Sequence, residues 1–142
     1  MKLLISHPTG NQNVRAAVSA LADEDIATFF DTTIATFRGD MLSQLSELRL
    51  FSAISRRRYD LRIKRITETY PWVELGRLAA LKAGVSALTR HEHGPFSIDA
   101  VYRNLDQHVA RRLEKKMANG LNGVYAYEDG ALLSFREANA SG

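Results

Sequence analysis

Short, mainly apolar runs alternate with longer segments of helical periodicity along this chain. Residues 2–6, 26–30 and 124–127 form such runs, and charged or turn-forming residues border each of them, so we predict strands there. Between these runs, apolar residues recur every three or four positions, which indicates helices. Strands that alternate with helices predict an α/β fold with a mainly parallel sheet, because parallel neighbours need long crossover connections.

Three of the predicted helices begin at a residue suited to N-capping: Asn13, Asp40 and Ser97. The helix after Ser97 is the most regular, and Asn119 with Gly120 ends it. Its predicted buried stripe comprises Ile98, Val101, Leu105, Val109, Leu113 and Met117. The apolar faces of the other two helices comprise Val14, Val18 and Leu21, and Met41, Leu42, Leu45 and Leu48.

Two further helices are predicted near Pro71 and Ala131. Pro71 suits a first helical turn and Gly84 follows the last one, so they bracket a helix whose Trp72 we expect to anchor the core. The predicted apolar faces of these helices comprise Trp72, Leu75, Leu78 and Ala79, and Leu132, Phe135 and Ala138. Residues 89–96 are predicted to form a loop, and residues 51–69 show no clear period.

The composition indicates one ordinary globular domain. The chain has 142 residues, of which 45% are hydrophobic and 25% are charged. The lack of cysteine excludes a disulfide, a thiolate nucleophile and a cysteine-ligated zinc ion. No charge-free apolar run approaches the roughly 20 residues of a membrane-spanning helix, and the apolar start is too short for a secretory signal. We therefore expect a cytoplasmic protein that at most lies peripherally on a membrane.

The formal net charge is +3, and two runs of basic residues stand at positions 56–65 and 111–116. The first run is typical either of a solvated face or of a contact with an anionic partner, and we expect Arg56, Arg57 and Arg58 to contact a membrane surface. The second run closes a helix, where cations complement the negative end of the helix dipole. Neither run is interleaved with the series of stacking aromatic residues that a single-strand binder needs, so we expect no nucleic acid.

Ligands of parallel α/β sheets bind outside the carboxyl ends of the strands, which here are followed by residues 7–13, 31–40 and 127–130. The first segment is polar, contains Gly10 and leads into a helix, so its backbone N–H groups suit an anionic group such as a diphosphate. It has neither the P-loop ending nor three spaced glycines. An ordinary strand-to-helix turn explains the segment equally well.

Two other polar segments are candidates for chemistry. Tyr127, Glu128 and Asp129 place a phenol and two carboxylates at a strand end, where a carboxylate can act as a general base or bind a sugar hydroxyl. Acidic residues at the start of a helix are also common because they suit its dipole. The segment 91–93, with two histidines, lacks a third ligand and the zincin spacing, so we expect no metal there.

A family resemblance rests on several segments taken together. The first is the strand ending in His7, Pro8 and Gly10, followed by residues 13–15, and the last and most distinctive is residues 124–132. Residues 68–74, 91–92 and 96–102 lie between them. The combination covers nearly the whole chain, and it resembles the N-terminal lobe of family 4-type glycosyltransferases of the two-lobed GT-B fold.

The resemblance implies a Rossmann-like three-layer domain over residues 1–142 that holds the acceptor, while a C-terminal lobe binds the nucleotide-sugar donor. It implies no cofactor and no metal. Gly10 corresponds to the family's glycine loop, and the implied substrate-binding residues are His7, Gly10, Asn11, Asn13 and Asp129. Tyr127 and Glu128 are the implied catalytic residues. Tyr127 stands where many relatives carry a histidine, and with an ordinary pKa of about 10 a phenol does not replace imidazole as a base.

We accordingly expect the acceptor-side domain of a glycosyltransferase, truncated near Gly142 and inactive without its donor lobe, because positioning accounts for much of the rate. The alternative is a free-standing α/β binding module whose basic surface docks nucleic acid or a protein partner. A reading frame that continues into a second α/β lobe would favour the enzyme, and a stop codon would favour the module.

Overall fold

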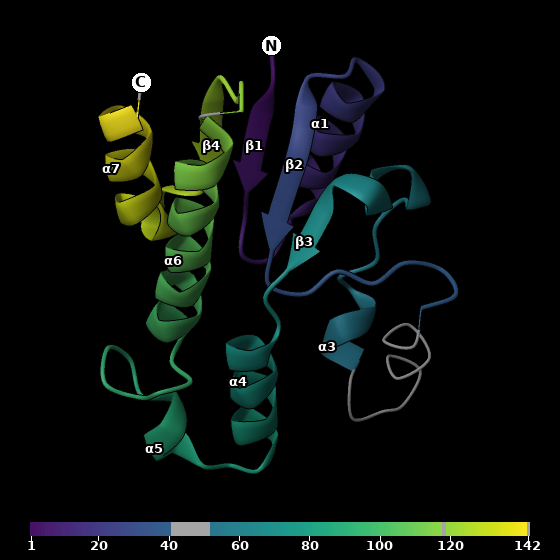
Figure 1. Ribbon diagram of the computed structural model, residues 1–142. Coiled ribbons are helices and arrows are strands. Elements are labelled where there is room, and N and C mark those ends of the chain that lie inside the picture. The colour runs from purple at the N-terminus through teal and green to yellow at the C-terminus, as the bar shows by residue number, and fades with distance from the viewer. Residues whose placement is uncertain (41–51, 118, 142) are drawn as a thin grey trace.

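The computed structural model describes residues 1–40, 52–117 and 119–141 (Figure 1). The helix predicted over residues 41–48 lies outside these residues. The elements in chain order are β1 (Leu3–Ser6), α1 (Gln12–Asp23), β2 (Ala27–Thr32), α3 (Ser52–Ser55), the 3-10 helix η2 (Leu61–Ile66), β3 (Thr67–Thr69), α4 (Trp72–Lys82), α5 (Ser86–Thr89), α6 (Ile98–Met117), β4 (Gly123–Ala126), the 3-10 helix η3 (Glu128–Gly130) and α7 (Leu132–Ser141).

The four strands form one sheet in the order β3-β2-β1-β4, and all neighbouring strands are parallel. This arrangement confirms the predicted α/β class and is consistent with a Rossmann-like fold. The chain runs outward from β1 to β3 and then crosses back through α4, α5 and α6 to place β4 on the other side of β1. Strand order therefore reverses between β1 and β4, which is where such sheets bind ligands.

Helices cover both faces of the sheet, with α1 on one face and α6 and α7 on the other (Figure 1). The side chains of β1 alternate between these layers, as the pleat requires. Ile5 packs with Val14 and Val18 of α1, whereas Leu4 packs with the buried stripe of α6. That stripe contains Val101, Leu105, Val109 and Leu113, which confirms the helix predicted after Ser97.

The helix starts agree only in part with the predicted caps. Ser97 caps α6, because its Oγ accepts a hydrogen bond from the backbone N–H of Ala100 (3.1 Å). The predicted cap of α1 was wrong: Asn11, not Asn13, is the N-cap, and its Oδ1 accepts from the N–H of Val14 (2.9 Å). The helix begins two residues earlier than predicted because the loop before it turns sharply at Gly10.

The predicted buried face of α4 was also wrong. Trp72 is 80% exposed and does not anchor the core. The buried residues of α4 are Glu74 and Ala80, because an ion pair between Glu74 and Arg57 turns that side of the helix inward. In α7, Leu132 and Phe135 are likewise exposed, since Ser134 faces α6 instead, whereas the third predicted residue, Ala138, packs against the core as expected.

A buried contact between a carboxyl group and a guanidinium ties α6 to the sheet. Asp31 of β2 is fully buried and accepts a hydrogen bond from the guanidinium of Arg112. Arg112, which belongs to the second basic run, therefore holds α6 against the sheet. Glu68 of β3 is paired in register with Asp31, and its carboxylate lies 3.9 Å from the same guanidinium. Burial raises the pKa of Asp31 to about 7, against the opposing effect of Arg112, and Glu68 raises it further.

No helix among the described residues combines the length and the apolar composition that crossing a bilayer requires.

Two exposed cations of the first basic run are paired at the surface: Arg62 with Asp23 and Asp60, and Lys64 with Asp40.

Replacing Asp31 with asparagine is expected to change how stability depends on pH. The folded carboxyl has a pKa of about 7 and its unperturbed value is 3.8, so the native state holds a proton that the unfolded chain releases. The stability that the protonated Asp31 carboxyl adds is complete below about pH 4 and is lost as pH rises to about 7. Within this range the free energy of unfolding falls by up to ~1.4 kcal/mol per pH unit. D31N should lack this slope in urea unfolding between pH 5 and pH 7. The exposed variant E24Q is the control, and parallel profiles for D31N and the parent protein would contradict the prediction.

Candidate functional site

The structure brings two of the predicted segments together at the carboxyl ends of β1 and β4. Ser6 and Ala126 end these strands as a register pair, and His7 and Tyr127 follow them directly. The backbone N–H of Tyr127 donates to the carbonyl of Ser6 (3.2 Å), and the rings of His7 and Tyr127 lie 4.8 Å apart between centroids. The candidate site is therefore the reversal point of the sheet.

His7 is buried, and its ring organises the loop that follows. The backbone N–H groups of Thr9 and Gly10 both donate to Nδ1, at 3.1 and 2.8 Å. Burial, and then the charge of Arg57, lower the pKa of His7. The ring is accordingly neutral at pH 7, and because Nδ1 accepts, the proton resides on Nε2. Within the described part of the chain, this buried Nε2 has no hydrogen-bond partner.

Gly10 is required by its backbone conformation and by its surroundings. Its φ is 56°, in the left-handed region that favours glycine. A Cβ atom at this position would lie 1.6 Å from the phenol oxygen of Tyr59. The carbonyl of Gly10 accepts from Nε of Arg15 (2.7 Å), whose guanidinium also donates to the carbonyl of Arg58 (3.2 Å). The glycine loop is thus locked against residues 56–59.

Arg57 joins this loop to α4. Its guanidinium donates to the carbonyl of Pro8 (3.1 Å) and to Oε1 of Glu74 (2.8 Å). Both side chains are largely buried, so the guanidinium of Arg57 holds parts of the fold together. The membrane contact expected for residues 56–58 stays a prediction. Arg56 and Arg58 are exposed.

A second aromatic contact extends the site toward α6. Tyr102 of α6 lies edge-on to Tyr127, with 6.0 Å between ring centroids. Burial raises the pKa of the Tyr102 phenol, and the nearby Tyr127, Asp129 and Glu74 raise it further. The phenol is therefore protonated at neutral pH and can donate a hydrogen bond.

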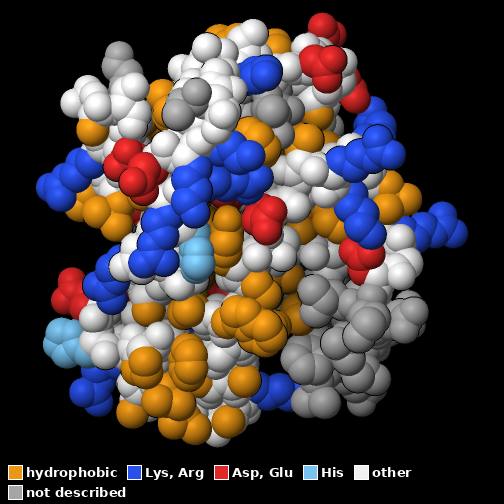
Figure 2. Space-filling model, viewed as in Figure 1, with side chains coloured by type: hydrophobic (Ala, Val, Ile, Leu, Met, Phe, Trp, Pro, Cys, Tyr) orange, Lys and Arg blue, Asp and Glu red, His pale blue; other side chains and the backbone are white. Residues whose placement is uncertain are grey.

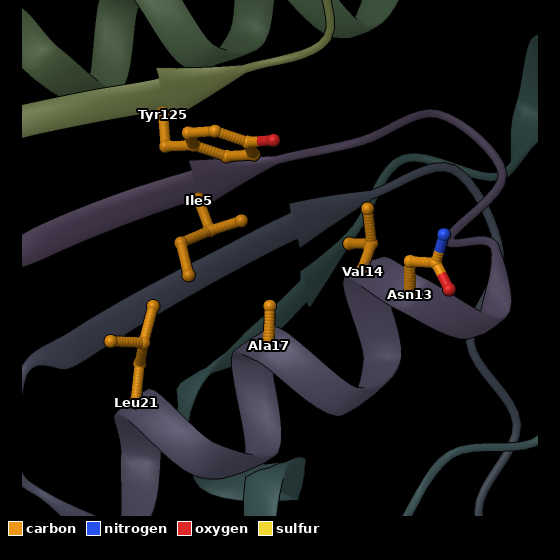
Figure 3. A pocket seen from close by; sticks show the side chains of 6 residues that line it. All are labelled: Ile5, Asn13, Val14, Ala17, Leu21 and Tyr125. Atoms are coloured by element: carbon orange, nitrogen blue, oxygen red, sulfur yellow. The ribbon is translucent and has the colours of Figure 1, made fainter.

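Asn11 and Asn13 have different surroundings. Asn11 uses its side-chain oxygen to cap α1. Asn13 is exposed and lies at the end of a pocket of about 300 Å³ between α1 and the strands β1 and β4 (Figure 3). The other lining residues are apolar or aromatic: Ile5, Val14, Ala17, Leu21 and Tyr125. This pocket does not have the polar lining that a phosphate needs.

Asp129 lies in a different cavity, of about 330 Å³, where η3 and the start of α7 meet α6. Arg103 and Gln107 of α6 line the same cavity, so it offers a carboxylate, a guanidinium and an amide to a ligand. Asp106 also lines it but is engaged in the fold, because its carboxylate accepts from the backbone N–H groups of Leu133 and Ser134. The side chain of Glu128 lies outside the described residues.

Two of the other three histidines have structural contacts. His91 Nε2 lies 3.5 Å from Asp99 Oδ1, and the other oxygen of Asp99 accepts from the N–H of Glu92 (2.8 Å). His108 stacks on Tyr70 with 4.2 Å between ring centroids. The segment 91–93 is therefore held against the first turn of α6.

Sequence reasoning missed four residues that shape this site: Arg57, Tyr59, Glu74 and Tyr102. Arg57 stands in a run of three arginines that gives no sign of which one is buried. Glu74 stands among apolar residues of α4, and this position was the one available signal, because an acid on a buried face needs a cation as a partner.

Comparisons of this chain with protein-family models, with curated proteins and with solved structures find no match. The Rossmann-like class thus stands on the sheet topology, and the resemblance to glycosyltransferases stays a prediction.

Substituting Gly10 with alanine should destabilise the protein strongly. Left-handed strain costs about 1–2 kcal/mol, and the overlap with Tyr59 adds about 1–3 kcal/mol because the ring must move. Gly39 is the matched control, since its φ is 92° and a Cβ atom there meets nothing within 4 Å. We expect urea unfolding to show a larger loss for G10A than for G39A. Equal losses would mean that Tyr59 does not restrict the loop.

Proposed function

We propose that this chain is the acceptor-side, Rossmann-like lobe of a glycosyltransferase, which acts with a second lobe that binds a nucleotide-sugar donor. One observation carries the proposal: His7 joins the glycine loop to the end of β4, at the reversal point of a parallel sheet. Topology directs ligands to this point. The segments that meet there, residues 7–13 and 127–130, also carry much of the family resemblance.

The proposed roles follow from the contacts of each residue. The loop at Gly10 leads into the N-terminus of α1, where the helix dipole favours an anionic group of a substrate. The N–H groups of Thr9 and Gly10 donate to His7 and that of Val14 to Asn11, so such a group would bind through the other N–H groups at the start of the helix. Tyr127 is half-buried and its phenol suits hydrogen bonding to, or stacking on, a sugar ring. His7 is a positioning residue, since it holds the loop through Nδ1 and packs against Tyr127. Asp129 and Arg103 supply an acceptor and a donor for hydroxyl groups in the neighbouring cavity.

This lobe alone lacks a way to orient the donor against the acceptor, and orientation provides a large share of the rate of a two-substrate transfer. We therefore expect the 142-residue chain to give no appreciable transfer from UDP-, GDP- or ADP-sugars, measured as release of the nucleoside diphosphate. Turnover by the chain itself would refute the two-lobed proposal. Tight, salt-sensitive binding of single-stranded oligonucleotides would instead favour a nucleic-acid-binding module.

His7 offers a sharper test in a polypeptide that contains both lobes. In H7N, the side-chain oxygen replaces Nδ1 as the acceptor for the N–H groups of Thr9 and Gly10, so the loop should keep its conformation. H7Q places its amide farther out and should lose that acceptor. We expect H7N to retain most of the thermal stability and H7Q to lose more, by about 1–2 kcal/mol.

Transfer activity should depend on the conformation of the loop after β1, so H7N should keep a larger share of kcat/KM than H7Q. G39A, in which the added Cβ atom meets nothing within 4 Å, is expected to leave kcat/KM unchanged. Equal transfer by H7N, H7Q and the parent enzyme would remove His7 and its loop from the proposed site.

A further inference from the structure

The turn between α4 and α5 forms an exposed tip. Every residue from Leu81 to Ala87 is exposed, and the apolar Leu81 and Val85 are 50% and 43% exposed. In Figure 1, α4 extends away from the carboxyl ends of the strands, and this turn is the part of the chain that reaches farthest in that direction. We call residues 81–87 the α4–α5 tip.

The backbone of the tip is fixed by hydrogen bonds. The N–H of Val85 donates to the carbonyl of Ala80 (3.0 Å), and the N–H of Gly84 donates to that of Leu81 (3.2 Å). Gly84 has a φ of 70°, so these bonds form the Schellman motif that ends many helices. Leu81 and Val85 are consequently presented to solvent by a defined turn rather than by a fraying helix end.

The exposed charges that border the tip are mainly positive. Between residues 71 and 91 the cations are Arg77, Lys82 and Arg90, and Lys82 and Arg90 are exposed. The single acid in this stretch, Glu74, is buried against Arg57. Figure 2 shows hydrophobic side chains gathered over the end of the molecule where α4 and α5 lie, with Lys and Arg side chains at the border and an acidic side chain beside a histidine at its left edge. The tip is thus apolar with a mainly cationic rim.

We propose that the α4–α5 tip docks onto the surface of an anionic lipid bilayer. Leu81 and Val85 enter the headgroup region, and Lys82 and Arg90 contact lipid phosphates. A fluid lipid layer closes around a protruding apolar tip, whereas a protein partner needs a cavity of matching shape. Lys82 and Arg90 are exposed on either side of the tip, and Glu92 is the exposed acid that follows them, so positive charge prevails next to an anionic surface.

Docking in this way would place the candidate site beside the membrane, because α4 extends from the same edge of the sheet. Lipid binding itself does not rest on the proposed transfer reaction. It is measured without any nucleotide sugar, so failure of one proposal leaves the other standing.

Sedimentation of the full chain with vesicles tests this inference. We expect binding to vesicles of phosphatidylcholine with phosphatidylglycerol, little binding to phosphatidylcholine alone, and release at high salt. K82Q and R90Q should each weaken the partition coefficient about fivefold, and L81S/V85S should weaken it about tenfold. All four side chains are exposed, so circular dichroism and melting temperature should stay unchanged.

Matched controls lie elsewhere on the surface. Leu61 and Phe135 are 52% and 48% exposed, and L61S/F135S removes as much apolar surface from η2 and α7. R111Q/K115Q removes two exposed cations from α6. Absence of binding to anionic vesicles would overturn the proposal, as would equal losses in the tip variants and these controls.

Fluorescence gives a second, independent measurement. Trp72 is the sole tryptophan of the chain, so W72F/V85W places one tryptophan in the tip. Anionic vesicles should shift its emission to shorter wavelength, and an unshifted emission would contradict insertion. Self-association that L81S/V85S abolishes, in chains that do not bind vesicles, would assign the tip to a second copy of this chain instead.

Discussion

The buried ion pair between Arg57 and Glu74 is the contact on which the arrangement of the site depends. Removing two charges from water is costly, and hydrogen bonds to the buried groups reduce that cost. Arg57 donates both to Oε1 of Glu74 and to the carbonyl of Pro8. Oε2 of Glu74 has no hydrogen-bond partner in the described part of the chain, and the guanidinium of Arg77 lies 3.8 Å from it. The guanidinium of Arg57 therefore joins the loop after β1, the segment before η2 and the first turn of α4.

Several other features follow from that pair. The inward turn of Glu74 leaves Trp72 facing solvent and sets the direction in which α4 leaves the sheet. The charge of Arg57 also adds to burial in keeping the His7 ring neutral, which lets Nδ1 accept the two N–H groups of the loop. The exposed tip and the closed glycine loop are thus two results of one buried interaction.

The sequence predicted the elements whose cause is local. The stripe of α6 and its cap at Ser97 follow from helical spacing and from one hydroxyl, and β1 follows from a short apolar run. Strand β3 was not predicted, because its three residues, Thr67–Thr69, carry no apolar pattern and are held by pairing with β2. The faces of α4 and α7 were misassigned for a similar reason: Glu74 and Ser134 are buried through partners distant in sequence. The site segments were predicted from strand ends, but the residues that connect them were not.

The contact between Gly10 and Tyr59 also restricts how this protein can change over generations. Glycine at position 10 meets two separate demands, a left-handed backbone and the space taken by the Tyr59 phenol. A smaller residue at position 59 would release only the second demand, so no single substitution there makes a larger residue at position 10 acceptable. Drift at these two positions is therefore asymmetric: position 59 can vary first, while position 10 stays fixed until the loop itself adopts another path.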